Sequence, residues 1–241
     1  MQLLSILNRI IRGASDEVHE VLLENRRFFE GFDQSGPITQ YEFTVFDTEL
    51  TGLNIKQDEI VSIGAVRIRD LKIVPGENFH CYVRPKNLPS KEATLVHRIT
   101  MDVLHTAPPI EEILPQFVLF CHGSFLVGHY VALDVNFLNK ALKEHLGGTI
   151  SNPCIDTMKL AQVFREEQWG NYYDRFNYQI SFNLEDLAKE YGLPNFDPHD
   201  ALEDAYQTAY LFLFLVKKLR SGGLTTMKDL YMAGRNRRWI F

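Results

Sequence analysis

Residues 41–53 read YEFTVFDTELTGL and predict a β-strand that ends in two carboxylates. Side chains two apart on a strand point to the same face, so Asp47 and Glu49 project side by side after the apolar Phe43 and Val45. Two adjacent buried carboxylates repel each other and are costly to desolvate. The pair therefore favours a divalent metal between them, and oxygen ligands suit Mg²⁺ or Mn²⁺. The alternative is a strand end that meets water, where both acids are solvated.

The bulk composition is that of an ordinary globular protein. The 241 residues, 45% hydrophobic and 23% charged, allow one large domain or one domain with an appendage. No apolar run approaches the roughly 18–20 residues of a membrane span. A net charge of −6 argues against a general electrostatic grip on nucleic acid, but not against an enzyme that acts on it. The cysteines Cys81, Cys121 and Cys154 are far apart, which predicts reduced thiols in a cytoplasmic protein without structural zinc.

Strands and helices alternate after residue 41, which predicts an α/β fold with a mixed sheet flanked by helices. The first three strands follow one another through short turns, as in an antiparallel meander, and Pro75-Gly76 marks a break or bulge in the third. After the strand with the acid pair, the expected strands are Glu59–Arg69, Ile73–Pro85, Phe125–Val127 and one ending at Ile155. The expected helices are Lys91–Val96, Met101–Leu104, Ile110–Phe120, Leu133–Leu146, Thr157–Glu167, Asn183–Glu190, Asp200–Arg220 and Thr225–Met232.

The segments outside this pattern are an N-terminal helical extension (1–40) and a C-terminal short helix with a basic, aromatic tail (221–241), on either side of a main domain (41–220). The extension holds helical patterns at Leu3–Ile11 and Asp16–Phe29. It either packs on the domain or docks on a partner or a membrane surface. The aromatic loop 168–182 could stack single-stranded bases or pack on the domain.

Two later stretches add acidic residues and a histidine. Asp134 lies in GHYVALDVNFL at the start of a predicted helix, where a capping role is the simple alternative. His199 and Asp204 lie in FDPHDALEDA. Five helical residues correspond to a net rotation of about 140°, so the two would not share a helix face. We therefore expect His199 in the preceding loop and Asp204 inside the helix, pointing into one site.

Taken together, FDTELTGL, GHYVALDVNFL and HDALEDA resemble the three motifs of the DEDDh 3′–5′ exonucleases, and most resemble the proofreading (epsilon) subunits of bacterial DNA polymerase III. The resemblance covers roughly Tyr41 to Leu219 and implies a ribonuclease H-like sheet of five strands. It implies that two divalent ions, Mg²⁺ or Mn²⁺, are bound by four acids and that a histidine acts as general base. The implied metal ligands are Asp47, Glu49, Asp134 and Asp204, and the implied base is His199.

The resemblance also implies a set of substrate contacts. Leu53 is similar to the apolar residue that wedges against the terminal base, and His97 and His129 match positions that line the substrate pocket. The full implied set is Thr48, Thr51, Gly52, Leu53, His97, His129, Tyr130 and Phe137. Two departures stand out: Arg98 replaces a usual glycine, and Tyr130 stands where an asparagine is common. Neither removes a metal ligand.

The expected function is metal-dependent removal of nucleotides from the 3′ end of single-stranded DNA, releasing nucleoside 5′-monophosphates in proofreading or repair. One alternative is a 3′–5′ exoribonuclease or oligoribonuclease. Another is an inactive exonuclease fold retained for nucleic-acid binding or scaffolding. The implied partners are a single-stranded 3′ end and a DNA polymerase subunit or other protein that docks on the N-terminal helices.

Overall fold

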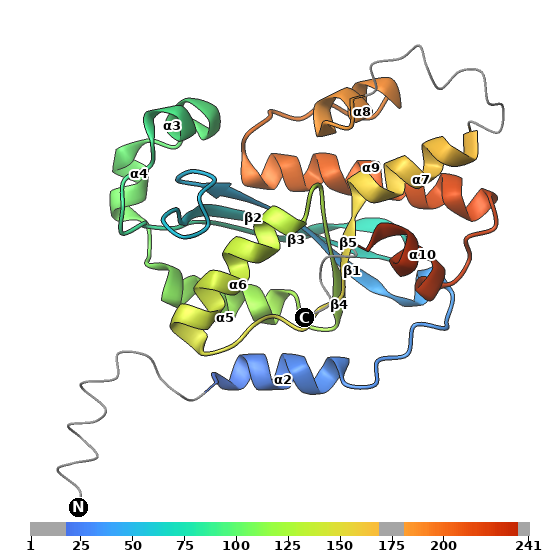
Figure 1. Ribbon diagram of the computed structural model, residues 1–241, viewed down its shortest axis with the longest axis horizontal. Helices are drawn as coiled ribbons and strands as arrows, with labels where there is room; N and C mark the ends of the chain where they lie inside the picture. Colours follow the sequence, from blue (N-terminus) through green and yellow to red (C-terminus); the bar gives the residue numbers. More distant parts are fainter. Residues whose placement is uncertain (1–17, 169–180, 236–241) are drawn as a thin grey trace, which may run out of the picture.

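The computed structural model describes residues 18–168 and 181–235 of the chain. A five-stranded sheet in the order β3-β2-β1-β4-β5 forms its centre (Figure 1). Strand β1 pairs antiparallel with β2 and parallel with β4, which confirms the expected mixed sheet. The strands are β1 (Glu42–Leu50), β2 (Ile60–Arg69), β3 (Lys72–Tyr82), β4 (Ser124–Gly128) and β5 (Cys154–Asp156).

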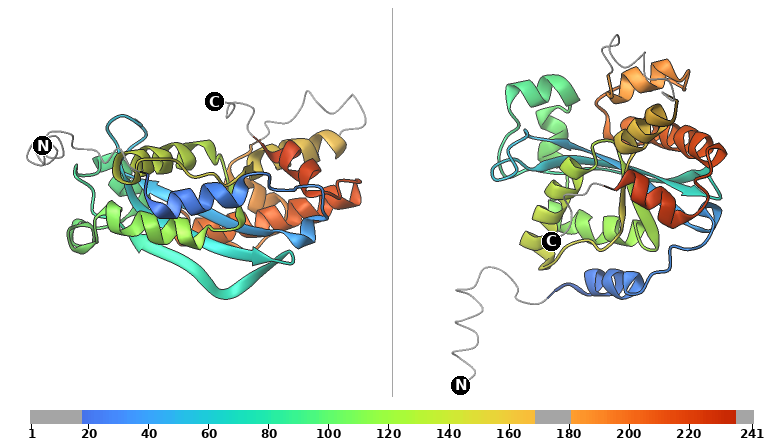
Figure 2. Two further views of the ribbon diagram at one scale, coloured as in Figure 1. Left: turned by 90° about the horizontal axis from the view of Figure 1, so that it is seen from below. Right: turned by 45° about the vertical axis from the view of Figure 1, so that its right-hand side comes forward.

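Helices cover both faces of the sheet, with α2, α5 and α6 on one side and α7, α9 and α10 on the other (Figures 1 and 2). Within the described ranges, no helix has the length and apolar character needed to cross a membrane. The helices are α2 (Glu20–Phe29), the 3₁₀ turn η1 (Ile38–Gln40), α3 (Lys91–His97), α4 (Met101–Thr106), α5 (Ile110–Phe120), α6 (Ala132–Leu146), α7 (Thr157–Gln168), α8 (Leu184–Glu190), α9 (Ala201–Ser221) and α10 (Met227–Gly234).

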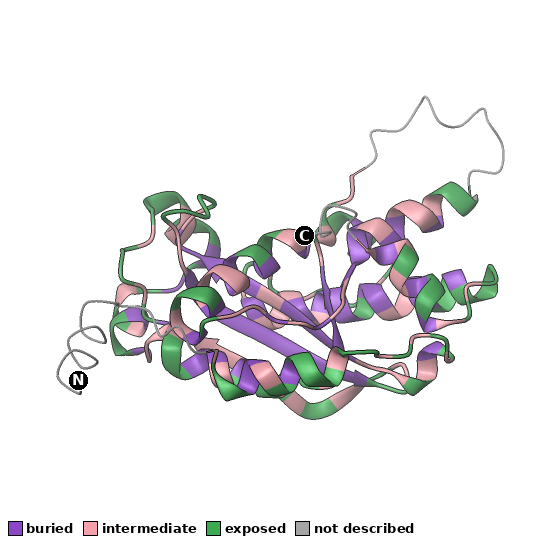
Figure 3. Ribbon diagram, turned by 60° about the horizontal axis from the view of Figure 1, so that its bottom comes forward, coloured by how far each residue is buried: buried purple, intermediate pink, exposed green. Residues whose placement is uncertain are grey.

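The alternation of β1 decides which face carries the acid pair. Phe46 and Leu50 belong to the apolar cluster under α5 and α6, whereas Phe43 and Val45 belong to the cluster under α9. The buried strands between the two helical layers are purple in Figure 3. Because the side-chain period of a strand is two, Asp47 and Glu49 continue the face of Phe43 and Val45. The acid pair therefore faces α9.

Gly64 on β2 allows the first turn of α9 to lie directly on the sheet. It is the cross-strand partner of Asp47. A Cβ atom at this position would come within 2.2 Å of the backbone of Ala201, the first residue of α9. Only glycine accommodates such a close approach. The start of α9 is therefore positioned beside Asp47.

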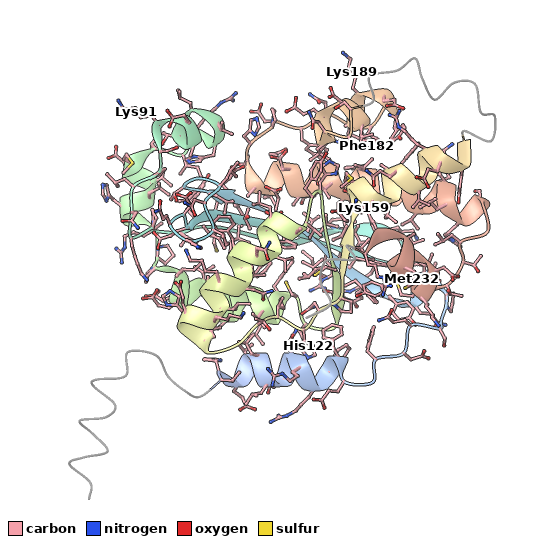
Figure 4. The ribbon with its side chains drawn as sticks, in the orientation of Figure 1. Lys91, His122, Lys159, Phe182, Lys189 and Met232 are labelled. Atoms are coloured by element: carbon pink, nitrogen blue, oxygen red, sulfur yellow. The ribbon has the colours of Figure 1, made fainter. Side chains whose placement is uncertain are left out.

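The extension contributes to the core through α2. Leu22 is 1% exposed within the cluster under α5 and α6. The buried Asn25 donates to Asn152 Oδ1 at 2.6 Å and accepts from the backbone N–H of Ser151 at 2.8 Å. Next to it, Phe28 packs edge-on against His122, which Figure 4 labels above α2. Of the two alternatives for the extension, packing on the domain therefore holds for α2, whose Val21, Leu22 and Asn25 are buried.

Some of the expected segments lie outside the residues that the structure describes. These are the first helical pattern, Leu3–Ile11, most of the aromatic loop 168–182 and the tail after Arg235. The division into 1–40, 41–220 and 221–241 stays a proposal. Helix α10 packs closely on the main domain, because Gly234 lies against Ile155 and Leu160.

Local signals in the sequence agree with the structure in most places. The pairing of β2 with β3 shifts register opposite Pro75-Gly76, as the bulge prediction requires. Gly147 ends α6 with φ 72°, the left-handed conformation that favours glycine. Asn183 is the N-cap residue of α8, as the expected helix start indicates, although its side chain makes no cap hydrogen bond.

Candidate active site

Three carboxylates meet where β1 passes under the start of α9. Oxygen atoms of Asp47, Glu49 and Asp204 all lie within 4.8 Å of one another. Asp204 belongs to the first turn of α9. His199 lies in the loop before the helix, as expected. The packing of α9 on β1 therefore brings together acids that lie more than 150 residues apart in the sequence.

The electrostatics of this group favour a bound cation. Burial and then repulsion from Asp134, Asp204 and Glu49 hold the pKa of Asp47 well above its usual value. Burial, followed by repulsion from Asp204, raises the pKa of Glu49 to about 8. Burial raises the pKa of Asp204 to about 6, although a hydrogen bond from His199 opposes the rise.

The donor set fits a divalent metal ion. In the part of the chain that the structure describes, no lysine or arginine forms an ion pair with any of these three acids. Their repulsion is therefore not relieved by a protein cation. Carboxylate oxygens at this spacing are the ligands that Mg²⁺ and Mn²⁺ prefer. The three acids could thus hold such an ion.

Asp134 lies next to this group but outside the three-carboxylate cluster. It is 5% exposed in the first turn of α6. One carboxylate oxygen accepts from the Thr48 hydroxyl at 2.6 Å and from the Thr48 backbone N–H at 3.0 Å. Burial raises the pKa of Asp134 to about 7, and the hydrogen bonds from Thr48 counteract part of that rise. Asp134 adds negative charge to the site, since it also raises the pKa of Asp47.

His199 lies beside the acids in a strained loop. Its backbone has φ 67°, and its N–H donates to Asp204 Oδ2 at 2.9 Å. The residue is exposed and lines a polar pocket together with Glu49 and Asp200. The side chain is therefore close to the carboxylates and reachable from solvent.

An apolar pocket of about 440 Å³ opens on one side of Glu49. Four of the predicted substrate contacts line it, namely Thr48, Gly52, Leu53 and His97. Leu53 is 76% exposed and stands free at its mouth. The pocket has the size and apolar lining of a site for a flat ring.

The pocket also includes residues that the sequence interpretation missed. Ala93 and Val96 of α3 line it, as does Leu133 of α6. Leu133 directly precedes Asp134 and is 40% exposed. The position of Leu133, an apolar residue directly beside the motif acid Asp134, is the sequence signal that could have identified it. No sequence signal identifies Ala93 and Val96, because only tertiary packing brings α3 to the pocket.

Thr51 positions the loop that carries Leu53 and is not itself part of the pocket lining. It is 2% exposed, and its hydroxyl donates to Asp58 Oδ1 at 3.1 Å and accepts from the Glu59 backbone N–H at 3.0 Å. Its carbonyl accepts from the Ser90 backbone N–H at 3.1 Å. These bonds connect the loop after β1 to β2 and to the start of α3.

His97 is the predicted contact whose chemistry the structure defines best. Its Nδ1 accepts from the backbone N–H of Ile99 at 3.0 Å, so the neutral ring carries its proton on Nε2. Burial lowers the pKa of His97, which favours that neutral form. Nε2 is buried and has no hydrogen-bond partner among the described residues. It is a donor available to a ligand.

The other predicted contacts have different surroundings. Both ring nitrogens of His129 are used within the protein, by the Thr157 hydroxyl at 2.8 Å and the Phe182 carbonyl at 2.7 Å. Phe137 is 1% exposed in the core and lines a separate cavity between α5 and α6, so the structure does not bring it to the acids. Tyr130 is 45% exposed with φ 54°, and buried Asp156 accepts its backbone N–H at 3.0 Å.

Comparison with known proteins gives this geometry a family. The family model described as "Exonuclease" matches residues 44–212, which contain all four acids and His199. A DNA polymerase III PolC-type protein of Caldanaerobacter subterraneus subsp. tengcongensis is 36% identical over 189 residues, which are 78% of this chain and 12% of that protein. A DNA polymerase III subunit epsilon-like protein of Rhodobacter capsulatus is 37% identical over 192 residues, covering 79% of this chain and 26% of that one.

Solved structures are similar across the same region. Exonuclease X in complex with 5′ overhanging duplex DNA superposes with a TM-score of 0.57 at 28% identity, covering 80% of this chain and 99% of that chain. E. coli Exonuclease I in complex with an oligonucleotide shares the fold, with a TM-score of 0.63 at 21% identity over 76% of this chain and 43% of that one. The three acidic motifs, the mixed sheet and the matched residues 44–212 agree, and the chain belongs to the exonuclease family.

Proposed function

We propose that the chain is a metal-dependent 3′–5′ exonuclease that removes nucleoside 5′-monophosphates from single-stranded DNA. One observation carries the proposal: the three-carboxylate cluster, exposed His199 and the apolar pocket meet at Glu49. Cation ligands, a titratable base and a ring-sized pocket are the parts that phosphodiester hydrolysis at a strand end requires.

The proposed ligands of two divalent ions, Mg²⁺ or Mn²⁺, are Asp47, Glu49 and Asp204, with Asp134 in a supporting position beside them. Bound cations would polarise the phosphate and lower the pKa of the attacking water. Burial of these acids makes their ionised forms costly. Metal binding and loss of their protons are therefore coupled.

His199 is the proposed general base. It removes a proton from the attacking water as the water oxygen bonds to phosphorus and the bond from phosphorus to the 3′ oxygen of the preceding nucleotide breaks. That 3′ oxygen takes up a proton from solvent. An imidazole that solvent can reach is able to accept this proton and release it again.

The apolar pocket is the proposed site of the terminal base. Leu53 and Leu133 offer apolar contacts, and the Nε2–H of His97 offers a donor to the nucleotide. His129 and Thr51 are proposed as positioning residues, because their polar atoms are occupied within the protein. We place Phe137 in the core rather than at the substrate.

DNA is the proposed substrate because the relatives are named as DNA polymerase III proteins and Exonuclease X was solved with DNA. The chain spans only 12 to 13% of the length of two PolC-type relatives. A DNA polymerase is the partner that these names suggest, and we propose that association on that basis alone.

Degradation of 5′-labelled single-stranded DNA and RNA of equal sequence tests the proposal. The assay compares Mg²⁺, Mn²⁺ and EDTA for the wild type, Asp47→Asn and a control, Asp102→Asn, at an exposed acid on α4. We expect a ladder that shortens from the 3′ end, faster on DNA, and lost with EDTA or Asp47→Asn but not Asp102→Asn. Faster loss of RNA would indicate the exoribonuclease alternative. No ladder in any metal would indicate a binding module.

A further inference from the structure

A second pocket adjoins the apolar pocket at Glu49. It has a volume of about 270 Å³ and lies among β2, β3, the turn from α3 to α4 and the loop before α9. Glu49 and His97 line both pockets and so form their common wall. On the function proposed above, a nucleotide whose base fills the apolar pocket would place its 5′-phosphate near this wall, because Glu49 belongs to the three-carboxylate cluster.

The second pocket carries one strong cation. Arg98 is the only lysine or arginine among its lining residues. Three carboxylates also line this pocket, those of Glu49, Asp197 and Asp200, and Oδ1 of Asp200 accepts the N–H groups of Leu202 and Glu203 at the start of α9. Within residues 18–168 and 181–235, the Arg98 guanidinium forms no ion pair with a carboxylate. An unpaired guanidinium presents a rigid fork of donors that matches the oxygens of a phosphate.

The backbone of Arg98 is in a conformation that costs stability. Arg98 ends α3 with φ 57° and ψ 12°, and its N–H donates to the Thr94 carbonyl at 2.9 Å. This left-handed position normally favours glycine, because a side chain there is strained. A strained residue beside a site is grounds for a functional hypothesis. Here the residue that bears the strain is also the pocket's cation.

The side of attack connects Arg98 to the chemistry. His199 lines the second pocket and is absent from the lining of the apolar one. If His199 is the base, the attacking water lies on the side of the second pocket. In an in-line displacement the phosphorus moves toward the attacking oxygen. With His199 as the base, the phosphate would therefore move toward the pocket that Arg98 lines as the bond to the leaving 3′ oxygen breaks.

We propose that Arg98 binds the 5′-phosphate of the terminal nucleotide in the second pocket, during cleavage and in the released nucleoside 5′-monophosphate. The proposal rests on the exonuclease function proposed above and adds an anion-binding residue to it.

The test uses three substitutions at Arg98 and two controls. Arg98→Asn removes the charge but tolerates the left-handed conformation, Arg98→Gly also removes the strain, and Arg98→Lys keeps a charge without the planar fork. Lys91→Asn removes a cation at the outer start of the same helix (Figure 4). Asp70→Gly relieves an exposed left-handed residue, φ 47°, in the turn between β2 and β3.

Cleavage, binding and stability are measured on the full chain with Mn²⁺. Cleavage is measured as kcat/KM on single-stranded DNA, and stability as the melting temperature. Binding is measured as the dissociation constants of thymidine 5′-monophosphate and of thymidine. For Arg98→Asn and Arg98→Gly we expect kcat/KM to fall about tenfold and the preference for the phosphorylated ligand to fall by a similar factor, the usual size of a charge-assisted hydrogen bond. Thymidine affinity stays constant. Arg98→Lys loses less.

Stability should change in the opposite direction to activity. Arg98→Gly and Asp70→Gly should each raise the melting temperature by about 2–4 °C, whereas only the first should lower activity. Lys91→Asn should change neither ligand preference nor kcat/KM. If Arg98 served only to end α3, its substitution would weaken the binding of thymidine 5′-monophosphate and of thymidine by the same factor.

The two proposals fail in different ways. If wild type cleaves and Arg98→Asn stays within twofold of it in kcat/KM and phosphate preference, the role of Arg98 is refuted while the exonuclease function stands. If wild type does not cleave, the function fails, and nucleotide binding still decides the role of Arg98. If wild type binds thymidine and its monophosphate equally, the phosphate site is refuted.

Discussion

Thr48 controls how readily Asp134 ionises, because both its hydroxyl and its backbone N–H donate to the same carboxylate oxygen. Thr48→Val removes the hydroxyl donor, so the pKa of Asp134 should rise above its value of about 7. Asp134 is then more often protonated at neutral pH. We expect kcat/KM to fall about tenfold at pH 7 and less at pH 9, with the acidic limb of the pH–rate profile moved to higher pH. Thr48→Ser, which keeps the donor, serves as the control; an unmoved limb in Thr48→Val would disprove the link.

At this same scale, the sequence predicted the placement of the clustered acids better than the surroundings of the other proposed site residues. Alternation along the strand placed Asp47 and Glu49 on one face, and the helical rotation between His199 and Asp204 placed His199 in the loop before the helix. Both follow from local backbone geometry. Which face packs on which helix is a tertiary property, so the burial of Phe137 and the exposure of Leu133 were not evident. The internal bonds of His129 likewise depend on Phe182, which is remote in sequence.

Among the elements, α9 determines whether the site exists, and Gly64 determines whether α9 fits. Gly64→Ala places a Cβ where the backbone of Ala201 lies, so the start of α9 must shift, moving His199 and Asp204 with it. A displacement of about 1 Å at a catalytic group costs on the order of 100-fold in rate. We therefore expect kcat to fall about 100-fold or more, with a loss of about 1–3 kcal/mol in the free energy of unfolding.

Gly76→Ala is the matched control for this loss of stability. Gly76 has φ 79° in the bulge of β3, and a Cβ there meets nothing within 4 Å. The substitution should cost about 1 kcal/mol of stability without lowering kcat. Equal activity losses in the two variants would show that stability, rather than placement of α9, limits the enzyme.

Helix α2 makes a separable contribution to stability. Asn25→Ala leaves Asn152 and the Ser151 N–H without their buried partner, which costs about 1–3 kcal/mol. We expect a lower midpoint in urea unfolding while kcat/KM stays close to wild type, because α2 is remote from the three-carboxylate cluster. Glu24→Ala, an exposed change on the same helix, should leave the midpoint unchanged. A catalytic defect in Asn25→Ala at low temperature would contradict this separation.

Most elements were predictable because their signals are local. Glycine at 147 and the bulge at 75–76 act through backbone conformation, and the long apolar pattern of α9 has a helical period. The role of α2 was left open between packing and docking. An amphipathic pattern indicates that one face will be covered, but not whether the cover is the same chain. The contacts that Leu22 and Asn25 make in the structure show that the same chain covers this face.

For the whole molecule, the buried acids make the metal-free protein sensitive to pH. The folded-state pKa values of Asp47 and Glu49 are raised, so the folded chain binds more protons than the unfolded chain between the ordinary value of 4.5 for Glu49 and its value of about 8. Stability is therefore fully present below that window and is lost as pH rises through it. Each pKa unit corresponds to about 1.4 kcal/mol.

We expect the melting temperature in EDTA to fall between pH 5 and pH 8, and Mn²⁺ to raise it more at pH 8 than at pH 5. Both trends should be weaker in Glu49→Gln, which removes one titrating carboxylate. Differential scanning calorimetry over this range measures them. A melting temperature in EDTA that rises with pH would refute the assignment of buried, uncompensated acids.

The closing of the site by α9 also has a consequence for synthesis. A ribosome produces Asp47 and Glu49 early and Asp204 only after all five strands, so a nascent chain that ends before α9 lacks one of the three clustered carboxylates. On the proposed ligand assignment, such a chain cannot hold its metal and cannot cut. On the same assignment, nuclease activity requires that α9 has been made and has docked on β1.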